Sequence, residues 1–84
     1  MKPLFFSRHA RGRLRLYNIS GEDVAFILDK PDREAPTIRG RRNAFRQVNG
    51  EWLRVTYTEE ERRLVIVTVT PLQRSEKVDY ENLL

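Results

Sequence analysis

His9 and Arg13 are the residues whose types and spacing could most directly support chemistry. An imidazole ring titrates near neutrality, which makes histidine the obvious general acid or base. The run HARGRLRLYNI, preceded by Ser7 as an N-cap, predicts a helix that begins at Arg8. Residues four apart lie on one side of a helix, so His9 and Arg13 would face the same point. Alternatively, His9 is a structural residue that bonds a backbone carbonyl near the helix start.

A second group of candidates comes from a predicted β-hairpin. Asn49-Gly50 joins two extended runs, FRQV and LRVTYT, and a type I′ turn needs positive φ at both central residues. A two-residue turn fixes which residues lie opposite each other and which share a side of the sheet. The expected cross-strand pairs are Gln47 with Trp52, Phe45 with Arg54 and Arg46 with Leu53.

One side of that hairpin would bring aromatic rings next to a cation. The residues that would share this face are Phe45, Gln47, Trp52, Arg54 and Thr56, whereas Arg46 would join Leu53 on the other face. Aromatic rings beside an arginine suit stacking on unpaired bases together with contacts to phosphate. Alternatively, Phe45 and Trp52 form a cross-strand pair that the C-terminal tail or a partner covers.

The other charged runs have less specific interpretations. Arg39, Arg41 and Arg42 could add phosphate contacts, or they could form an ordinary solvated loop. Glu59-Glu60-Glu61 is expected to be a hairpin tip that discourages edge-to-edge aggregation, not a divalent-cation site. With a single histidine and no cysteine, we expect no metal site and no cofactor.

The charge of the chain indicates an anionic partner. The net charge is +4, and residues 1–57 hold twelve Lys and Arg against six Asp and Glu. Thirteen of the sixteen cations are arginine, whose planar fork suits phosphate and carboxylate groups. Nucleic acid or an acidic protein is therefore the expected class of partner. Alternatively, the arginines only keep a small domain in solution.

The apolar patterning predicts an α+β fold with the element order β-α-α-β-β-β. Leu4 to Phe6 reads as an edge strand, Ser20 and Asp23 as the capping box of a second helix, and Lys30-Pro31 as the end of that helix. Residues 32–43 are expected to be a loop, and a three-stranded antiparallel meander follows it.

The two helices are expected to form a hairpin that packs on one face of the antiparallel sheet. The buried stripe of the first helix would consist of Ala10, Leu14 and Tyr17. Given an odd number of residues in the last turn, the buried face of the sheet would consist of Val55, Tyr57, Val65, Val67 and Val69.

The length and composition predict one domain. Eighty-four residues suffice for one core, which we place in residues 1–72, with a polar C-terminal tail in residues 73–84. No apolar run approaches the roughly 18 residues of a membrane span, and the one near the N-terminus is too short for a signal peptide. We therefore expect a cytoplasmic protein that does not enter a membrane.

Several residues, in a fixed order, form a pattern along most of the chain. They are Ser7-Arg8-His9-Ala10, Arg13, Ile19-Ser20, Asp23-Val24, Ile27-Leu28 and Pro31, followed by an arginine-rich loop and three strands that end in Val-Ile-Val-Thr-Val. With this pattern, the chain over roughly residues 4–71 is similar to small bacterial domains of unknown function that carry a His-Ala…Arg helix. Their fold resembles that of RelE/ParE-type toxins, and BrnT toxins are similar as well.

The resemblance implies a toxin of a toxin–antitoxin system that cleaves mRNA as an endoribonuclease without a metal ion. RNA or the ribosome and an antitoxin protein are the partners it implies. His9 matches the family's helix histidine and Arg13 its following arginine, whereas Arg46 and Arg54 lie on strands where such toxins place phosphate-binding cations. The alternative is a non-enzymatic module that binds RNA or protein, including ParE-like inhibition of a protein target.

Overall fold

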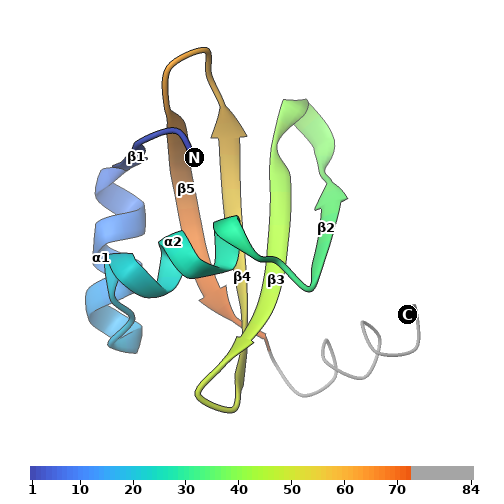
Figure 1. Cartoon of the computed structure of the whole chain (residues 1–84). Coiled ribbons are helices and arrows are strands. Elements are labelled where there is room, and N and C mark those ends of the chain that lie inside the picture. Colours follow the sequence, from blue (N-terminus) through green and yellow to red (C-terminus); the bar gives the residue numbers. More distant parts are fainter. Residues whose placement is uncertain (73–84) are drawn as a thin grey trace.

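The computed structural model describes residues 1–72 as two helices and a five-stranded sheet (Figure 1). The strand order across the sheet is β1-β5-β4-β3-β2. The predicted tail, residues 73–84, lies outside the described residues. The elements in chain order are β1 (Leu4–Phe6), α1 (Arg8–Tyr17), α2 (Gly21–Asp29), β2 (Arg33–Pro36), the 3-10 turn η1 (Ile38–Gly40), β3 (Arg42–Val48), β4 (Glu51–Glu59) and β5 (Leu64–Pro71).

Both helices begin at the predicted caps. The Ser7 hydroxyl oxygen accepts a hydrogen bond from the Ala10 backbone N–H at 3.0 Å. Ser20 and Asp23 form the reciprocal capping box that their spacing predicts. Such caps stabilise a helix by about 1 kcal/mol because they satisfy N–H groups that have no partner within the helix.

The β3–β4 hairpin has the predicted turn and register. Asn49 and Gly50 have φ values of 52° and 83°, so both lie in the left-handed region that the turn requires. The three expected cross-strand pairs are all present. The prediction that Arg46 and Arg54 lie on opposite faces of the sheet is therefore confirmed.

The composition of the sheet differs from the prediction at both edges. Residues 33–36 form β2, antiparallel to β3, where a loop was expected. At the other edge β1 is parallel to β5, so the sheet is mixed and not wholly antiparallel. The sequence REAP of β2 is polar and contains proline, which an edge strand tolerates but which gives no strand signal.

A bulge shifts the register between β4 and β5. Thr56 pairs with Thr68 but Tyr57 pairs with Ile66, which leaves Val67 as an extra residue. The buried residues of β5 are consequently Leu64, Ile66 and Val69, and the prediction for Val65 and Val67 is wrong. The run VIVTV is apolar at consecutive positions, so side-chain alternation could not reveal the shift.

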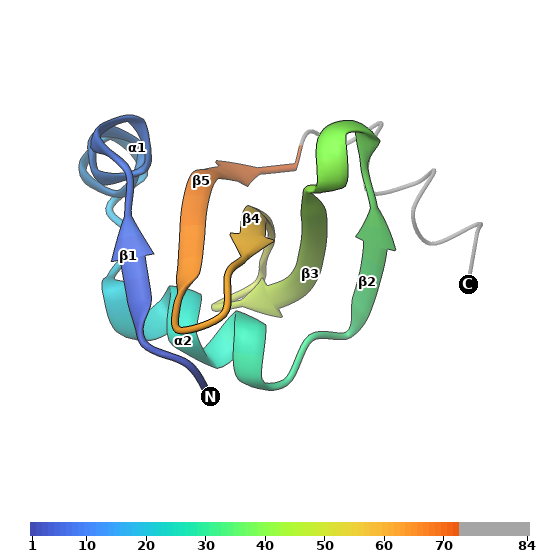
Figure 2. The same cartoon turned by 90° about the horizontal axis from the view of Figure 1, so that it is seen from above.

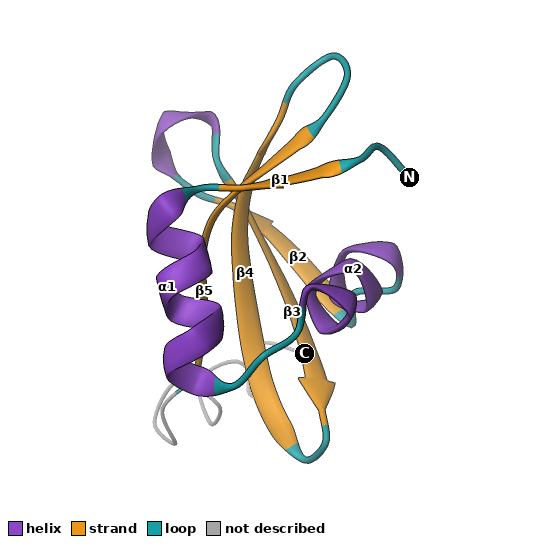
Figure 3. Cartoon of the chain, turned by 90° about the vertical axis from the view of Figure 1, so that its left-hand side faces the viewer, coloured by secondary structure: helices purple, strands orange, loops and turns teal. Residues whose placement is uncertain are grey.

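The helices do not pack together on one face. α2 crosses one face of the sheet, whereas α1 runs along β5 at the side of the sheet (Figures 2 and 3). Ala10 is fully buried, but Tyr17, expected in the same buried stripe, is 37% exposed. The largest fully buried side chains are Ile27, Ile66, Val24, Val55 and Val69.

The sheet thus has two faces of different character. The front face packs on α2 and carries the core, and the strand residues that alternate with the core residues form the opposite face, which we call the rear face. Within residues 1–72, no helix is long and apolar enough to cross a membrane. The rear face consists of Arg33, Ala35, Asn43, Phe45, Gln47, Trp52, Arg54, Thr56, Thr58, Val65, Thr68 and Thr70.

Candidate functional site

Ser7 fixes the start of α1 on β5. Its backbone N–H donates to the Ile66 carbonyl at 3.1 Å, and its hydroxyl donates to the Val67 carbonyl, also at 3.1 Å. Val67 is the extra residue of the bulge, so the bulge and the helix cap meet at this joint. The joint places His9, two residues further along α1, beside Thr68 of β5.

Three side chains on α1 form a hydrogen-bonded line that we call the α1 row: His9, Arg13 and Tyr17. Arg13 Nε donates to His9 Nε2 over 3.4 Å, and Arg13 Nη1 donates to the Tyr17 hydroxyl over 3.2 Å. A guanidinium group can only donate. In this arrangement His9 Nε2 is therefore the acceptor. The prediction that His9 and Arg13 face the same point is confirmed.

Thr68 links the α1 row to the rear face. Its hydroxyl oxygen lies 3.1 Å from His9 Nε2. Thr68 pairs with Thr56 of β4, whose hydroxyl donates to Asn43 Oδ1 of β3 at 2.6 Å. A line of polar side chains thus runs from α1 across three strands.

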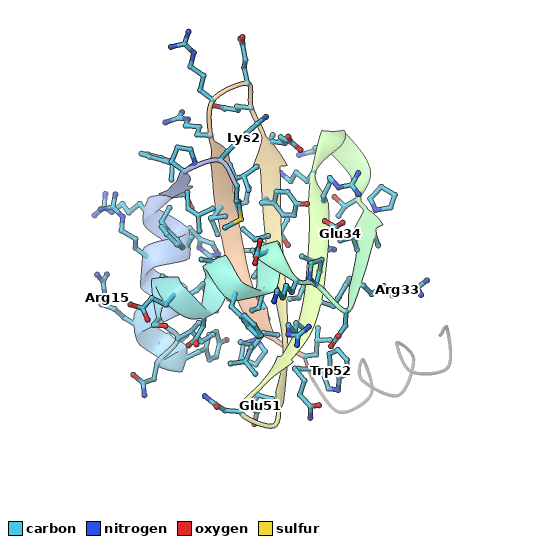
Figure 4. The ribbon with its side chains drawn as sticks, viewed as in Figure 1. Lys2, Arg15, Arg33, Glu34, Glu51 and Trp52 are labelled. Atoms are coloured by element: carbon cyan, nitrogen blue, oxygen red, sulfur yellow. The ribbon has the colours of Figure 1, made fainter. Side chains whose placement is uncertain are left out.

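The predicted aromatic and arginine residues lie directly beside this line. Phe45, Trp52 and Arg54 share the rear face and are half-buried. Arg54 pairs with Thr70, two residues along β5 from Thr68. Neighbours on one face of a sheet are about 5 Å apart across strands and about 7 Å along them, so Arg54 lies diagonally across from Thr68, the strand residue that contacts His9. Figure 4 shows Trp52 at the hairpin end of β4.

The rear face carries positive charge and, among its residues defined above, no carboxylate. The acidic residues of the strands, Glu34, Glu51 and Glu59, alternate onto the front side. Glu34 accepts a hydrogen bond from the Tyr57 hydroxyl at 2.7 Å, and burial together with this bond raises the pKa of Tyr57. Lys2, at 2.8 Å, lowers the pKa of Glu59. The strand carboxylates are thus kept away from the rear face.

A pocket of about 490 Å³ lies at the Tyr17 end of the α1 row. Its wall is largely apolar and includes Val48, Leu53 and Pro71, while Asp23 and Glu51 also line it. This mixture suits a planar, uncharged group with hydrogen-bond donors better than it suits a phosphate. Phosphate would be better accommodated by the cations of the α1 row and the rear face.

Arg46 is not brought together with the other catalytic candidates. It lies on the front side, where Nη1 donates to the Lys30 carbonyl at 2.7 Å and to Asp32 Oδ1 at 3.2 Å. Its guanidinium carbon is 4.5 Å from the centre of the Phe26 ring on α2. Arg46 thus joins β3 to the end of α2.

The loop arginines are also separate from the α1 row. Arg39 lies in η1 with a φ of 67°, and Arg41 directly precedes β3. Both are exposed. Arg42 pairs with Tyr57 and so belongs to the front side.

Tyr17, Thr68, Thr56 and Asn43 are site residues that the sequence reasoning missed. Tyr17 could have been found, because it lies four residues after Arg13 on the same stripe of the helix. The hairpin register predicted the face on which Thr56 lies but not its link to His9. Thr68 could not be found from the sequence, since the bulge decides which residues of β5 face His9. Among the residues that the structure describes, no group of three His, Asp or Glu side chains could hold a metal ion.

Comparison with known proteins identifies a family. A family model described as a domain of unknown function (DUF4258) matches residues 6–71. No curated protein and no solved structure matches the chain. The predicted resemblance to a small family of unknown function is therefore confirmed, while the similarity to RelE/ParE and BrnT toxins stays a prediction.

Proposed function

Since the chain belongs to a family of domains of unknown function (DUF4258), we propose its function from its surface chemistry: a metal-independent endoribonuclease of the RelE-like toxin type. The observation that carries this proposal is the position of the α1 row beside a rear face without carboxylates. His9 and Arg13 then lie at one edge of a surface that also carries Arg54 and two aromatic rings, and a polyanion can approach this surface.

RNA supplies its own nucleophile, so few protein groups are needed. The 2′-oxygen attacks the adjacent phosphorus while its proton moves to Nε2 of His9. The bond from phosphorus to the 5′-oxygen breaks, and that oxygen takes a proton from water. The hydroxide that remains takes the proton from His9, which restores the base. The products are a 2′,3′-cyclic phosphate and a 5′-hydroxyl end.

Arg13 and Arg54 would stabilise the charge that develops on phosphorus. Guanidinium groups donate paired hydrogen bonds to phosphate oxygens, and donors fixed in advance lower the barrier most. Phe45 and Trp52 would stack on the flanking bases, each such contact contributing about 1–3 kcal/mol to binding.

A toxin of this type needs a neutralising partner. In this proposal an antitoxin covers the rear face and the α1 row, and an acidic segment would match their charge. The ribosome is the alternative platform on which the RNA would be presented.

The test is cleavage of a synthetic single-stranded RNA by the purified full chain in the presence of EDTA. We expect products with cyclic phosphate ends, and no cleavage of the same RNA carrying 2′-O-methyl groups. His9→Ala should slow cleavage at least about 100-fold, the usual contribution of a general base. Leu16→Ala is the matched control, because Leu16 is on the same helix and 67% exposed; it should cleave like the wild type.

Two results would contradict the proposal. Cleavage that persists in His9→Ala would show that His9 is not the general base. Cleavage of the methylated RNA would exclude the 2′-oxygen as nucleophile. Salt-sensitive binding without any cleavage, with or without ribosomes, would instead support the non-enzymatic RNA-binding module.

A further inference from the structure

α1 carries a second set of arginines that the proposed active site does not use. Arg8, Arg11 and Arg15 are exposed and follow the spacing i, i+3, i+7. At about 100° per residue, these three lie on one side of the helix, and the α1 row lies on the opposite side. The buried stripe of Ala10 and Leu14 runs between the two sides. Figure 4 shows Arg15 turned away from the sheet.

The charge of these three arginines is not neutralised by any residue that the structure describes. Among residues 1–72, no hydrogen bond or ion pair joins their side chains to another residue. α1 itself contains no acidic residue. By contrast, Arg46 pairs with Asp32 and Arg63 pairs with Glu60 at 2.7 Å.

The same side continues onto β1 as an aromatic and cationic surface. Phe5 is 45% exposed, and the guanidinium carbon of Arg63 lies 4.5 Å from the centre of its ring. A shallow depression of about 200 Å³ is lined by Phe5 and Arg11 together with Leu4 and Phe6. We call Arg8, Arg11, Arg15 and Phe5 the outer ridge.

We propose that the outer ridge binds the phosphate backbone of the same RNA whose cleaved segment lies on the rear face. This inference rests on the proposed function and adds the class of substrate: an RNA that passes around α1, longer than the few nucleotides that the rear face holds. The unpaired cations are complementary to the dense charge of an RNA backbone. A helix with its side chains is only about 10–12 Å across, so one RNA strand can reach both sides.

The electrostatic contribution of the ridge can be measured through salt. Neutralising a phosphate of single-stranded RNA adds about 0.7 to the slope of log affinity against log salt concentration. R11Q/R15Q should therefore lower the slope for a fluorescein-labelled 20-nucleotide RNA by about 1.4. The affinity for a four-nucleotide RNA should stay as in the wild type, because that RNA occupies the rear face alone.

K30Q/R62Q is the matched control, since it removes the same charge from two exposed residues away from α1. It should leave the slope for the 20-nucleotide RNA within about 0.3 of the wild type, well below the change of about 1.4 expected for the ridge. Circular dichroism of each variant verifies that the fold is intact. If both variants lower the slope of log affinity against log salt concentration equally, only the net charge of the protein matters. That result would overturn the proposal that the outer ridge binds RNA.

The remaining outcomes separate this inference from the proposed function. If R11Q/R15Q keeps the wild-type slope while the wild type cleaves RNA, the ridge proposal fails and the function stands. If the ridge variant keeps RNA binding but loses binding to poly-glutamate, the surface serves an acidic protein and the proposal also fails. If the wild type binds neither RNA, both proposals fail together.

Discussion

Arginine has three different environments in this molecule, and the environment decides what each residue can do. Arg13 donates to His9 and Tyr17, which fixes its guanidinium beside the candidate base. Arg46 is fixed by a carbonyl, a carboxylate and an aromatic ring on the front side. Arg15 is exposed on the outer side of α1. Sequence position alone does not separate these roles, because all three residues lie in regular elements.

Arg46→Ala is predicted to affect stability and not RNA cleavage. The variant loses the bond to the Lys30 carbonyl, the partly exposed ion pair and the contact with Phe26. Together these interactions stabilise the fold by about 1–2 kcal/mol, most of it from the charged bond to a carbonyl. Urea unfolding measures the loss, and the cleavage assay should give the wild-type rate for folded protein. A folded Arg46→Ala that no longer cleaves would return Arg46 to the catalytic group.

Tyr57 is predicted to make stability depend on alkaline pH. Burial and the bond to Glu34 raise its pKa above the ordinary value of 10.0. The neutral hydroxyl therefore stabilises the fold fully below about pH 10, and this contribution falls by up to about 1.4 kcal/mol per pH unit above it. Tyr57→Phe should cost about 1 kcal/mol at pH 7 and lack this dependence.

The measurement is urea unfolding at several values from pH 7 to 11. Tyr17→Phe serves as the control, because Tyr17 is exposed and, within residues 1–72, its hydroxyl bonds to Arg13 of the same helix. If Tyr57→Phe and the wild type lose stability in parallel above pH 10, the Tyr57–Glu34 contact has no role in the effect.

At the scale of elements, local signals predict well and non-local ones do not. Ser7, Ser20 and Asn49-Gly50 act within a few residues, so caps, hairpin and register could be read from the sequence. β2 and β1 pair with the outer strands of the meander, β3 and β5. Their pairing therefore depends on the meander having formed, and no short stretch of sequence encodes it. The bulge at Val67 depends on the helix cap that bonds it. For this reason Arg13 could be placed beside His9 from the sequence, but Thr68 could not.

Two glycine-to-alanine variants are predicted to have opposite effects. In both positions an added Cβ would meet nothing within 4 Å, so only backbone preference matters. Gly12 has helical geometry, and Gly12→Ala should stabilise α1 by up to about 1 kcal/mol. Gly50 has a φ of 83°, and Gly50→Ala should destabilise the hairpin by about 1 kcal/mol or more. Thermal unfolding of the two variants side by side would contradict this account if both shifted in the same direction.

At the scale of the whole molecule, one core connects both helices to the sheet. Ala10 of α1, Val24 of α2 and Val55 of β4 belong to the same buried cluster. Lys2 binds Glu59 Oε2 and the Glu60 carbonyl, both at 2.8 Å, so the N-terminus is tied to the β4–β5 hairpin. The predicted single domain should therefore unfold in one cooperative transition. Far-ultraviolet circular dichroism and the fluorescence of Trp52 should give coincident urea curves, and separate midpoints would contradict one domain.

Under the proposed function, the two cationic surfaces on opposite sides of α1 would orient the whole molecule toward RNA. The α1 row faces the rear face, where the proposed chemistry occurs, and the outer ridge faces away from it. Their separation by the buried stripe of one helix means that variants on either side can be made without disturbing the other. If the proposals hold, cleavage and backbone binding should therefore be separable by mutation.

The measurement that tests the central claim most directly is mapping of RNA 5′ ends in cells after induced expression of the wild type and of His9→Ala, with growth followed in parallel. The proposal predicts growth arrest with new 5′-hydroxyl ends in the wild type, and loss of both in a folded His9→Ala protein present at the same level. New ends that persist in His9→Ala, or arrest without new ends, would contradict an endoribonuclease with its base at His9.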